Sequence, residues 1–195
     1  LFFPYLEEHK ITTLIHLGDV VDRRKFINFN TAHNFQNKFW KRLWDMKIDT
    51  HIILGNHDTY YKNTNEVNAI DLLLKEYDNV RVYSETTNIC IDGLNILLVP
   101  WINSENKEKS LALIKDSQSP VCMGHLELKG YKVNEYVVMD HGLDDKPFEK
   151  FERVFSGHFH TRSNNGKVYY FGNPYEMYWN DYDDTRGFHF FDTNT

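Results

Sequence analysis

The chain has 195 residues, of which 41% are hydrophobic and 26% are charged, and its formal net charge at pH 7 is −6. This share of apolar and aromatic residues is typical of a globular protein and excludes a disordered, collagen-like or coiled-coil chain. No apolar run approaches the roughly 20 residues that span a bilayer, which excludes an integral membrane protein. The negative charge argues against a broad basic surface for nucleic acid.

The cysteines and the first residues of the sequence indicate the cellular compartment of the protein and the extent of the chain. Cys90 and Cys122 have neither the spacing of a metal motif nor that of a disulfide framework, so we expect a cytoplasmic protein. The sequence begins Leu1-Phe2-Phe3-Pro4, with neither Met nor a signal peptide, and we interpret it as part of a longer protein. It contains no repeat or Gly/Pro/Ser-rich linker, so residues 1–195 are expected to form one domain.

Hydrophobic periodicity predicts alternating strands and helices. In chain order we expect a helix end at 5–10, a strand at 12–17, a helix at 31–47, a strand at 51–54, a helix at 66–77, strands at 80–83, 88–91 and 94–99, a helix at 105–115, and strands at 120–123, 153–156, 168–171 and 187–191. Asp92-Gly93 and Asn165-Gly166 are typical of hairpin turns, so some pairing should be antiparallel. The β-α alternation favours an α/β fold.

Four of the predicted strands run into a glycine that is followed by a residue type that binds metal ions. The segments are Leu17-Gly18-Asp19, Leu54-Gly55-Asn56-His57-Asp58, Met123-Gly124-His125 and Ser156-Gly157-His158-Phe159-His160. Side chains at the carboxyl ends of strands in α/β sheets converge on one crevice, and glycine permits the tight turn there. Carboxylate, amide and imidazole donors suit Mn, Fe, Zn or Co and suit calcium poorly. The four segments together predict one transition-metal site.

These motifs, in this order, resemble those of the calcineurin-like metallophosphoesterases. Gly-Asp-x-x-Asp, Gly-Asn-His-Asp, Gly-His and Gly-His-x-His are four of the five motifs of that family. Residues 96–101, 124–128, 141–143 and 171–174 are most similar to SbcD-type DNA-repair nucleases, including those of T-even phages. The resemblance implies a β-sandwich of mixed sheets flanked by helices (α/β/β/α). It also implies metal-dependent phosphodiester hydrolysis by a DNA exo/endonuclease subunit of an SbcCD-like recombination or repair complex.

The resemblance further implies two divalent metal ions, with Mn favoured and Fe, Zn or Co left open. A shared carboxylate can hold two cations roughly 3.5 to 4 Å apart, where they clamp a phosphate and activate water for in-line attack. Asp19 would be this bridging ligand. The first ion would also take His160, and the second would take Asn56, His125 and His158.

Other residues would act on the substrate rather than on the metals. His57 resembles the family's catalytic histidine, which stabilises or protonates the leaving oxygen, and Asp58 would orient its ring. Arg23 and Arg24 could contact substrate phosphates, or they could equally be a basic run that lies in solvent. The residues expected to support the metal ligands or to contact the substrate are Asp22, Arg23, Arg24 and His141.

The chain departs from the family pattern at its first motif, Asp-x-His, which belongs to a strand ahead of the helix that ends near Lys10. We therefore expect a domain truncated at the N-terminus, an incomplete first metal site, and an exposed sheet edge that favours a homodimer. A C-terminal capping domain is also expected to be absent. The implied partners are DNA and an SbcC-type ATPase subunit, with no membrane, in the cytoplasm or, for a viral source, the host cytoplasm.

Two other functions stay open. The same chemistry could act on a phosphomonoester, nucleotide or phosphoprotein, because 18–23 also resembles the serine/threonine phosphatase motif. Alternatively, the missing motif favours a non-catalytic scaffold that binds a protein partner. The remaining histidines, His16 among them, are expected to be structural. Tyr175, Tyr178 and Trp179 could stack on bases, but in so aromatic a chain we expect them to pack.

Overall fold

The computed structural model describes residues 1–134 and 136–193. The helices are α1 (Phe2–Glu8), α2 (Phe29–Phe35), the π-helical η1 (Gln36–Trp40), α3 (Lys41–Asp45), α4 (Ala69–Leu74), α5 (Lys107–Asp116), and the 3₁₀ turns η2 (Lys146–Phe148) and η3 (Trp179–Asp181). The strands are β1 (Thr13–His16), β2 (Asp49–Ile53), β3 (Val80–Tyr83), β4 (Thr87–Ile91), β5 (Leu94–Val99), β6 (Val121–Gly124), β7 (Arg153–Ser156), β8 (Ser163–Asn164) and β9 (Val168–Tyr170).

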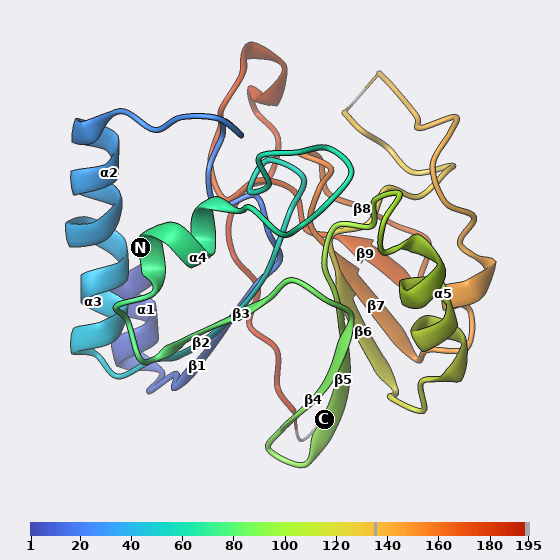
Figure 1. The fold of residues 1–195 in the computed structure, drawn as a ribbon, viewed down its shortest axis with the longest axis horizontal. Coiled ribbons are helices and arrows are strands. Elements are labelled where there is room, and N and C mark those ends of the chain that lie inside the picture. Colours follow the sequence, from blue (N-terminus) through green and yellow to red (C-terminus); the bar gives the residue numbers. More distant parts are fainter. Residues whose placement is uncertain (135, 194–195) are drawn as a thin grey trace.

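Two sheets lie between outer layers of helix (Figure 1). The first sheet is parallel, with strand order β1-β2-β3, and the second is mixed, with order β4-β5-β6-β7-β9-β8. Helices α1 to α3 lie beside the first sheet and α5 lies beside the second. The expected α/β fold of mixed sheets flanked by helices is therefore confirmed.

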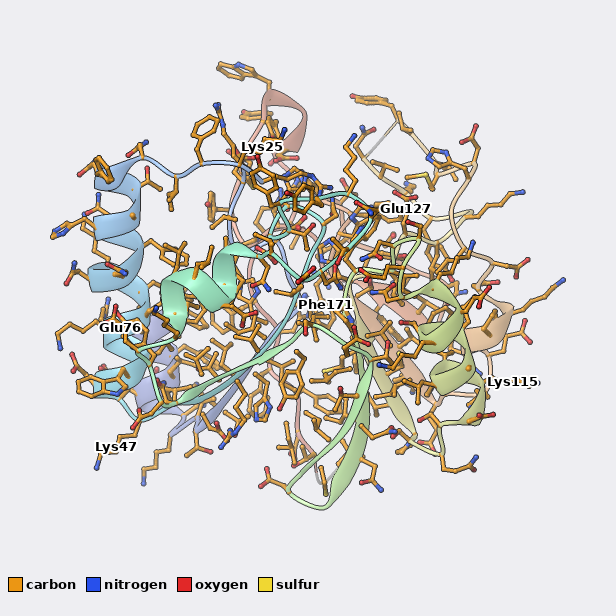
Figure 2. The ribbon with its side chains drawn as sticks, in the orientation of Figure 1. Lys25, Lys47, Glu76, Lys115, Glu127 and Phe171 are labelled. Carbon is orange, nitrogen blue, oxygen red and sulfur yellow. The ribbon has the colours of Figure 1, made fainter. Side chains whose placement is uncertain are left out.

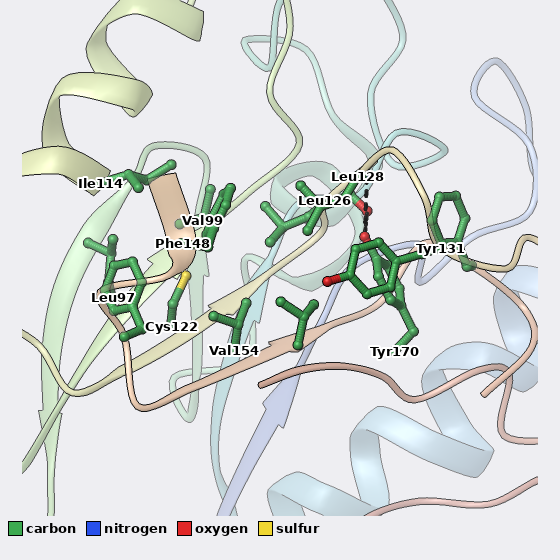
Figure 3. Packing of buried hydrophobic residues seen from close by; sticks show 13 residues of the cluster. Leu97, Val99, Ile114, Cys122, Leu126, Leu128, Tyr131, Phe148, Val154 and Tyr170 are labelled. Carbon is green, nitrogen blue, oxygen red and sulfur yellow. Dashed lines mark hydrogen bonds between the residues drawn. The ribbon is translucent and has the colours of Figure 1, made fainter. Parts of the chain in front are cut away.

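Three clusters of buried hydrophobic side chains hold these layers together. One joins α1, α3 and α4 to the first sheet, and includes the fully buried Leu43 and Ile52. A second draws Ile53 from the first sheet and Leu98 from the second, so it lies between the sheets. The third packs α5 and η2 on the far face of the second sheet (Figure 3). The strand ends that follow these cores are consequently held in fixed relative positions.

Tyr170 connects the third cluster to the segment that follows β6. Its hydroxyl donates to the carbonyl oxygen of Leu126 at 3.0 Å and accepts from the backbone N–H of Leu128 at 3.2 Å (Figure 3). The ring is 2% exposed, so these hydrogen bonds form inside the core. Tyr170 thereby anchors the backbone on both sides of Glu127.

Local sequence explains several element boundaries. Asn68 caps α4, because its side-chain oxygen accepts from the backbone N–H of Asp71 at 2.8 Å. This cap makes α4 begin later than the expected residue 66. The hairpin between β4 and β5 is confirmed, and its turn uses positive φ at Asp92 (50°) and Gly93 (82°). The helix expected at 31–47 exists as α2, η1 and α3 in succession, with a π-helical middle.

The strand expected at 187–191 is wrong, since the structure shows no strand there. A strand requires a hydrogen-bonded neighbour, whereas this segment is attached through its rings. Phe188 lies with its centroid 5.1 Å from that of Phe2, and His189 stacks on Phe171 at 3.8 Å. Among the described residues, no helix has the length and apolar character needed to cross a membrane.

Candidate metal centre and active site

The carboxyl ends of β1, β2, β6 and β7 meet at one point. The Gly18-Asp19 turn follows β1, Gly55-Asn56 follows β2, and His125 and His158 follow β6 and β7. Backbone hydrogen bonds join neighbouring turns, as between the Gly157 N–H and the Gly124 carbonyl oxygen at 3.0 Å. The convergence that the sequence predicts at these strand ends is therefore present.

Glycine is required at Gly55 because the neighbouring turn approaches its backbone closely. A Cβ atom there would lie 2.2 Å from both the backbone nitrogen and the Oδ1 atom of Asp19. Asp19 itself has φ of 53°, a left-handed conformation that costs a non-glycine residue energy. His158 shares this feature, with φ of 82°. Strained backbone at two candidate ligands is typical of functional sites.

Asp58 holds the Asp19 turn in place. It is fully buried, and its carboxylate accepts hydrogen bonds from the backbone N–H groups of Gly55 (2.7 Å), Asp19 (2.8 Å), Val20 (2.8 Å) and Val21 (3.2 Å). Burial and then the charge of Asp19 raise the pKa of Asp58 to about 6, although the backbone donors oppose this rise. Asp58 thus joins the turns after β1 and β2.

Four electron-pair donors converge at the centre of these turns. The Oδ1 atom of Asn56 lies 3.0 Å from both Nε2 of His125 and Nδ1 of His158, and these two nitrogens lie 3.2 Å apart. The Oδ2 atom of Asp19 lies 3.3 Å from Nε2 of His125. Asp19, His125 and His158 offer ligand atoms that all lie within 4.8 Å of one another.

The outward-facing nitrogens of both histidines determine what this cluster can bind. Nδ1 of His125 donates to the Leu17 carbonyl oxygen at 2.7 Å, and Nε2 of His158 faces Oε2 of Glu127 at 3.2 Å. With protons assigned to those atoms, lone pairs of both rings point at the oxygens of Asn56 and Asp19. Lone pairs facing one another at these distances fit a shared cation, so the residues present suit a divalent metal ion.

The electrostatics agree with a site that attracts positive charge. Burial alone raises the pKa of Asp19, but the charge and hydrogen bond of His125 when that ring is protonated, and then the backbone N–H of His57, lower it well below its usual range. A cation between the two side chains would take the place of the Nε2 proton. Burial lowers the pKa of His125, but Asp19 outweighs it and holds that pKa above its ordinary value. Asp19 is therefore ionised at neutral pH and available as a ligand.

His57 projects beside this cluster rather than into it. Its backbone N–H donates to Oδ1 of Asp19 at 2.7 Å, and its Nδ1 lies 2.5 Å from the carbonyl oxygen of Asp22. The expectation that Asp58 orients the His57 ring is thus corrected: the carboxylate of Asp58 binds backbone donors, and the ring is held by Asp22. The Asp22 carbonyl oxygen accepts a hydrogen bond from Nδ1–H, which leaves Nε2 available.

An open cavity of about 370 Å³ lies next to the cluster. Its wall includes His57 and His160 but not His125, which is buried behind it. His160 stacks against the ring of Tyr178, with centroids 5.7 Å apart and planes 7° apart. The lining residues are Asp19, Asn56, His57, Val133, Asn134, Met139, His158, Phe159, His160 and Tyr178.

The structure places the other expected substrate residues away from this lining. Arg24 donates to the Thr59 side chain at 3.1 Å, Arg23 pairs with the Asp22 carboxylate at 3.6 Å, and His141 is exposed and pairs with its neighbour Asp140 at 2.7 Å. Within the described part of the chain, Arg23, Arg24 and His141 do not line the cavity.

Two residues with contacts at the site were not singled out from the sequence. Glu127 lies against His158, at the same end of the molecule as Lys25 (Figure 2). His16, expected to be structural, is half-buried with an inaccessible Nδ1 atom, close enough to Asp19 and His125 to sense their charges, and desolvation lowers its pKa to about 4. The position of Glu127, two residues after His125 in Gly-His-Leu-Glu, was the available sequence signal for it, while nothing local distinguished His16.

Comparisons with known proteins identify the family. The model of the calcineurin-like phosphoesterases matches residues 2–162. The chain belongs to the calcineurin-like phosphoesterase family. The four glycine-containing turns that meet at the donor cluster fall within the matched region of this phosphoesterase.

Individual proteins are similar to this chain over most of its length. Exonuclease subunit 1 of Enterobacteria phage T4 is 40% identical to this phosphoesterase over 191 residues, which cover 98% of this chain and 56% of the relative. The chain therefore spans little more than half of that protein. One solved structure aligns over 88% of this chain and 82% of its own at a TM-score of 0.51 and 13% identity, which shows the fold. An archaeal phosphodiesterase aligns over 88% of this chain and 73% of its own length, at a TM-score of 0.39 and 14% identity.

Proposed function

We propose that this chain is a manganese-dependent phosphodiesterase, the nuclease subunit of a DNA-processing complex. The observation that carries the proposal is the group of donors from Asp19, Asn56, His125 and His158, with the free Nε2 of His57 beside it in an open cavity. A scaffold has no need for buried lone pairs that face one another, since their desolvation would only weaken the fold.

The four donors would hold one divalent ion, with His160 on the cavity wall as a ligand for a second. When bound, such ions polarise phosphoryl oxygens and make water nucleophilic at neutral pH. The carboxylate, amide and imidazole set suits Mn²⁺. Glu127 would help by holding the proton of His158 on Nε2, so that Nδ1 stays free for the ion.

His57 would act on the leaving group. In hydrolysis, water adds to phosphorus, the bond from phosphorus to the leaving oxygen breaks, and that oxygen must gain a proton. The Asp22 carbonyl fixes the Nδ1 proton of His57, so the protonated ring presents its Nε2–H to the cavity. The products are a phosphate monoester and an alcohol.

The substrate and partner are proposed from the relative. Phage T4 exonuclease subunit 1 is named as a subunit of a nuclease. On that basis we assign DNA as the substrate, and an ATPase of the SbcC type as the partner of the longer protein. A phosphomonoester substrate is the competing assignment within the family.

The number of bound metal ions tests the donor cluster. Calorimetric titration of the 195-residue chain with Mn²⁺ should show at least one site, and Asn56→Ala and His125→Ala should each weaken it, with circular dichroism confirming the fold. A second site would assign a ligand role to His160, to be tested by His160→Ala. Absence of Mn²⁺ binding by the folded parent chain would refute the proposal.

The reaction is tested with two chromogenic substrates and a DNA oligonucleotide in Mn²⁺. His57→Ala should reduce phosphodiester turnover by roughly 10²- to 10⁴-fold while retaining Mn²⁺ binding. His33→Ala, an exposed histidine on α2, is the matched control and should leave turnover unchanged. A parental rate in His57→Ala would exclude the mechanism. Clear preference for the phosphomonoester would instead favour the phosphatase assignment.

A further inference from the structure

The loop of residues 171–187 has a buried, hydrogen-bonded base. Asp181 is fully buried, and its Oδ2 atom accepts from the backbone N–H groups of Met177 at 3.0 Å and Tyr178 at 3.1 Å. Arg186, whose side chain is 8% exposed, pairs with Oδ1 of Asp181 at 3.1 Å and also donates to the His160 carbonyl oxygen. The loop is therefore attached to the same turn that carries His158 and His160.

This firmly held loop exposes a group of aromatic rings. Trp179 is 96% exposed, Tyr182 77%, Tyr175 64% and Tyr178 52%. The expectation from the sequence that these rings pack inside is thus wrong for Trp179 and Tyr175. Aromatic side chains contribute most to stability when buried, so a loop with a hydrogen-bonded base that holds several in solvent is typical of a binding surface.

One of these rings, that of Tyr178, adjoins the proposed active site. Tyr178 lines the cavity together with His57, and its ring stacks on His160. Trp179 is the next residue and begins η3, which projects at the top of Figure 1. A group that lies over the Tyr178 ring is therefore next to whatever phosphate the cavity holds, and Trp179 is its neighbour in the chain.

We propose that Tyr178 and Trp179 form a stacking platform for unpaired bases of a single-stranded nucleic acid whose phosphate lies in the cavity. This inference rests on the proposed function and specifies its substrate. A nucleotide joins an aromatic base to a phosphate, so it is a ligand that can occupy both surfaces at once. Paired bases inside a duplex do not present their faces, which makes the platform selective for single strands or frayed ends.

The charge of the protein supports stacking as the mode of recognition. Its net charge of −6 leaves little nonspecific attraction for a polyanion. The exposed Lys25 lies at the same end of the molecule as Glu127 (Figure 2). Its ammonium group lies over the Tyr60 ring, 5.5 Å from the ring centroid. Stacking on ring faces does not depend on the base sequence, and it supplies affinity that the negative net charge of the protein does not.

Binding can be measured without turnover, by anisotropy of a labelled thymidine 15-mer with EDTA present. Trp179→Ala and Tyr178→Ala should each weaken binding by roughly 5- to 150-fold, whereas Trp179→Phe and Tyr178→Phe, which keep a ring, should retain most of it. Phe29→Ala is the matched control, since Phe29 is 94% exposed on α2. An abasic 15-mer should bind weakly and equally to all variants. Tryptophan emission should fall on binding, and less so in Trp179→Phe.

The outcomes separate this inference from the proposed function. Binding by Trp179→Ala and Tyr178→Ala within twofold of the parent, or equal losses with the abasic strand, would overturn the platform, as would a parent chain that does not bind the 15-mer. If the parent binds as expected but does not hydrolyse the chromogenic phosphodiester with Mn²⁺, the platform stands and the catalytic proposal fails.

Discussion

Replacement of Gly55 by alanine tests whether the turns after β1 and β2 interlock as described. The new Cβ would lie 2.2 Å from two atoms of Asp19, whereas an ordinary contact is at least 3.4 Å. One turn must therefore move by more than about 1 Å, a displacement that close-packed surroundings resist. The hydrogen bonds from Gly55 and Asp19 to the buried Asp58, at 2.7 and 2.8 Å, cannot survive such a movement unchanged.

The expected loss follows from these two effects. Overpacking costs about 1–3 kcal/mol, and each backbone hydrogen bond to the carboxylate of Asp58 contributes about 1.5–3 kcal/mol. Allowing for partial relaxation of the turn, we expect Gly55→Ala to lose about 4 kcal/mol of unfolding free energy. For a chain of this size that corresponds to a fall of about 8–16 °C in Tm.

The assay is urea unfolding followed by far-ultraviolet circular dichroism, with EDTA present so that metal binding does not add to stability. Gly93→Ala is the control, because a Cβ there meets nothing within 4 Å while φ is +82°. Gly93→Ala should lose only the unfolding free energy that a left-handed conformation costs a non-glycine residue, about 1–2 kcal/mol. If Gly55→Ala lies within about 1 kcal/mol of Gly93→Ala, the close approach of the two turns is not what requires glycine.

Three further predictions concern other parts of the molecule. Glu127→Ala should weaken Mn²⁺ binding by roughly 10- to 100-fold in calorimetry, since the proton of its histidine partner is no longer held, and unchanged affinity would refute that role. Burial lowers the pKa of His51, despite the opposing charge of a nearby aspartate. The unfolded chain therefore binds more protons as pH falls below about 6.5, so the parent should lose more unfolding free energy between pH 7 and 5 than His51→Gln. Equal losses in the two proteins, measured by urea unfolding at each pH, would contradict this. Burial raises the pKa of the Cys122 thiol, whereas Cys90 is exposed, so a thiol reagent should label Cys90 alone in the native protein and both in urea.

The sequence by itself was sufficient for the α/β class and for the meeting of the donor side chains, although not for the segment 187–191. Glycine followed by a donor residue at four strand ends predicted where the strands stop and that Asp19, Asn56, His125 and His158 would meet. This works because parallel strands present their carboxyl ends on one edge, so that local motifs far apart in the chain become neighbours. The hairpin at Asp92-Gly93 was equally local, since its positive φ values depend on the two turn residues themselves.

Only the tertiary structure decided the contacts that hold those ligands and the state of the exposed rings. The partner of His57 is the Asp22 carbonyl 35 positions away, and the partner of His158 is Glu127, 31 positions away. No periodicity encodes such pairs, because they depend on the packing of whole layers. The exposure of Trp179 is of the same kind: a tryptophan in a sequence has an apolar ring, but which face of the fold it reaches is set by the buried Asp181 and Arg186 beneath it.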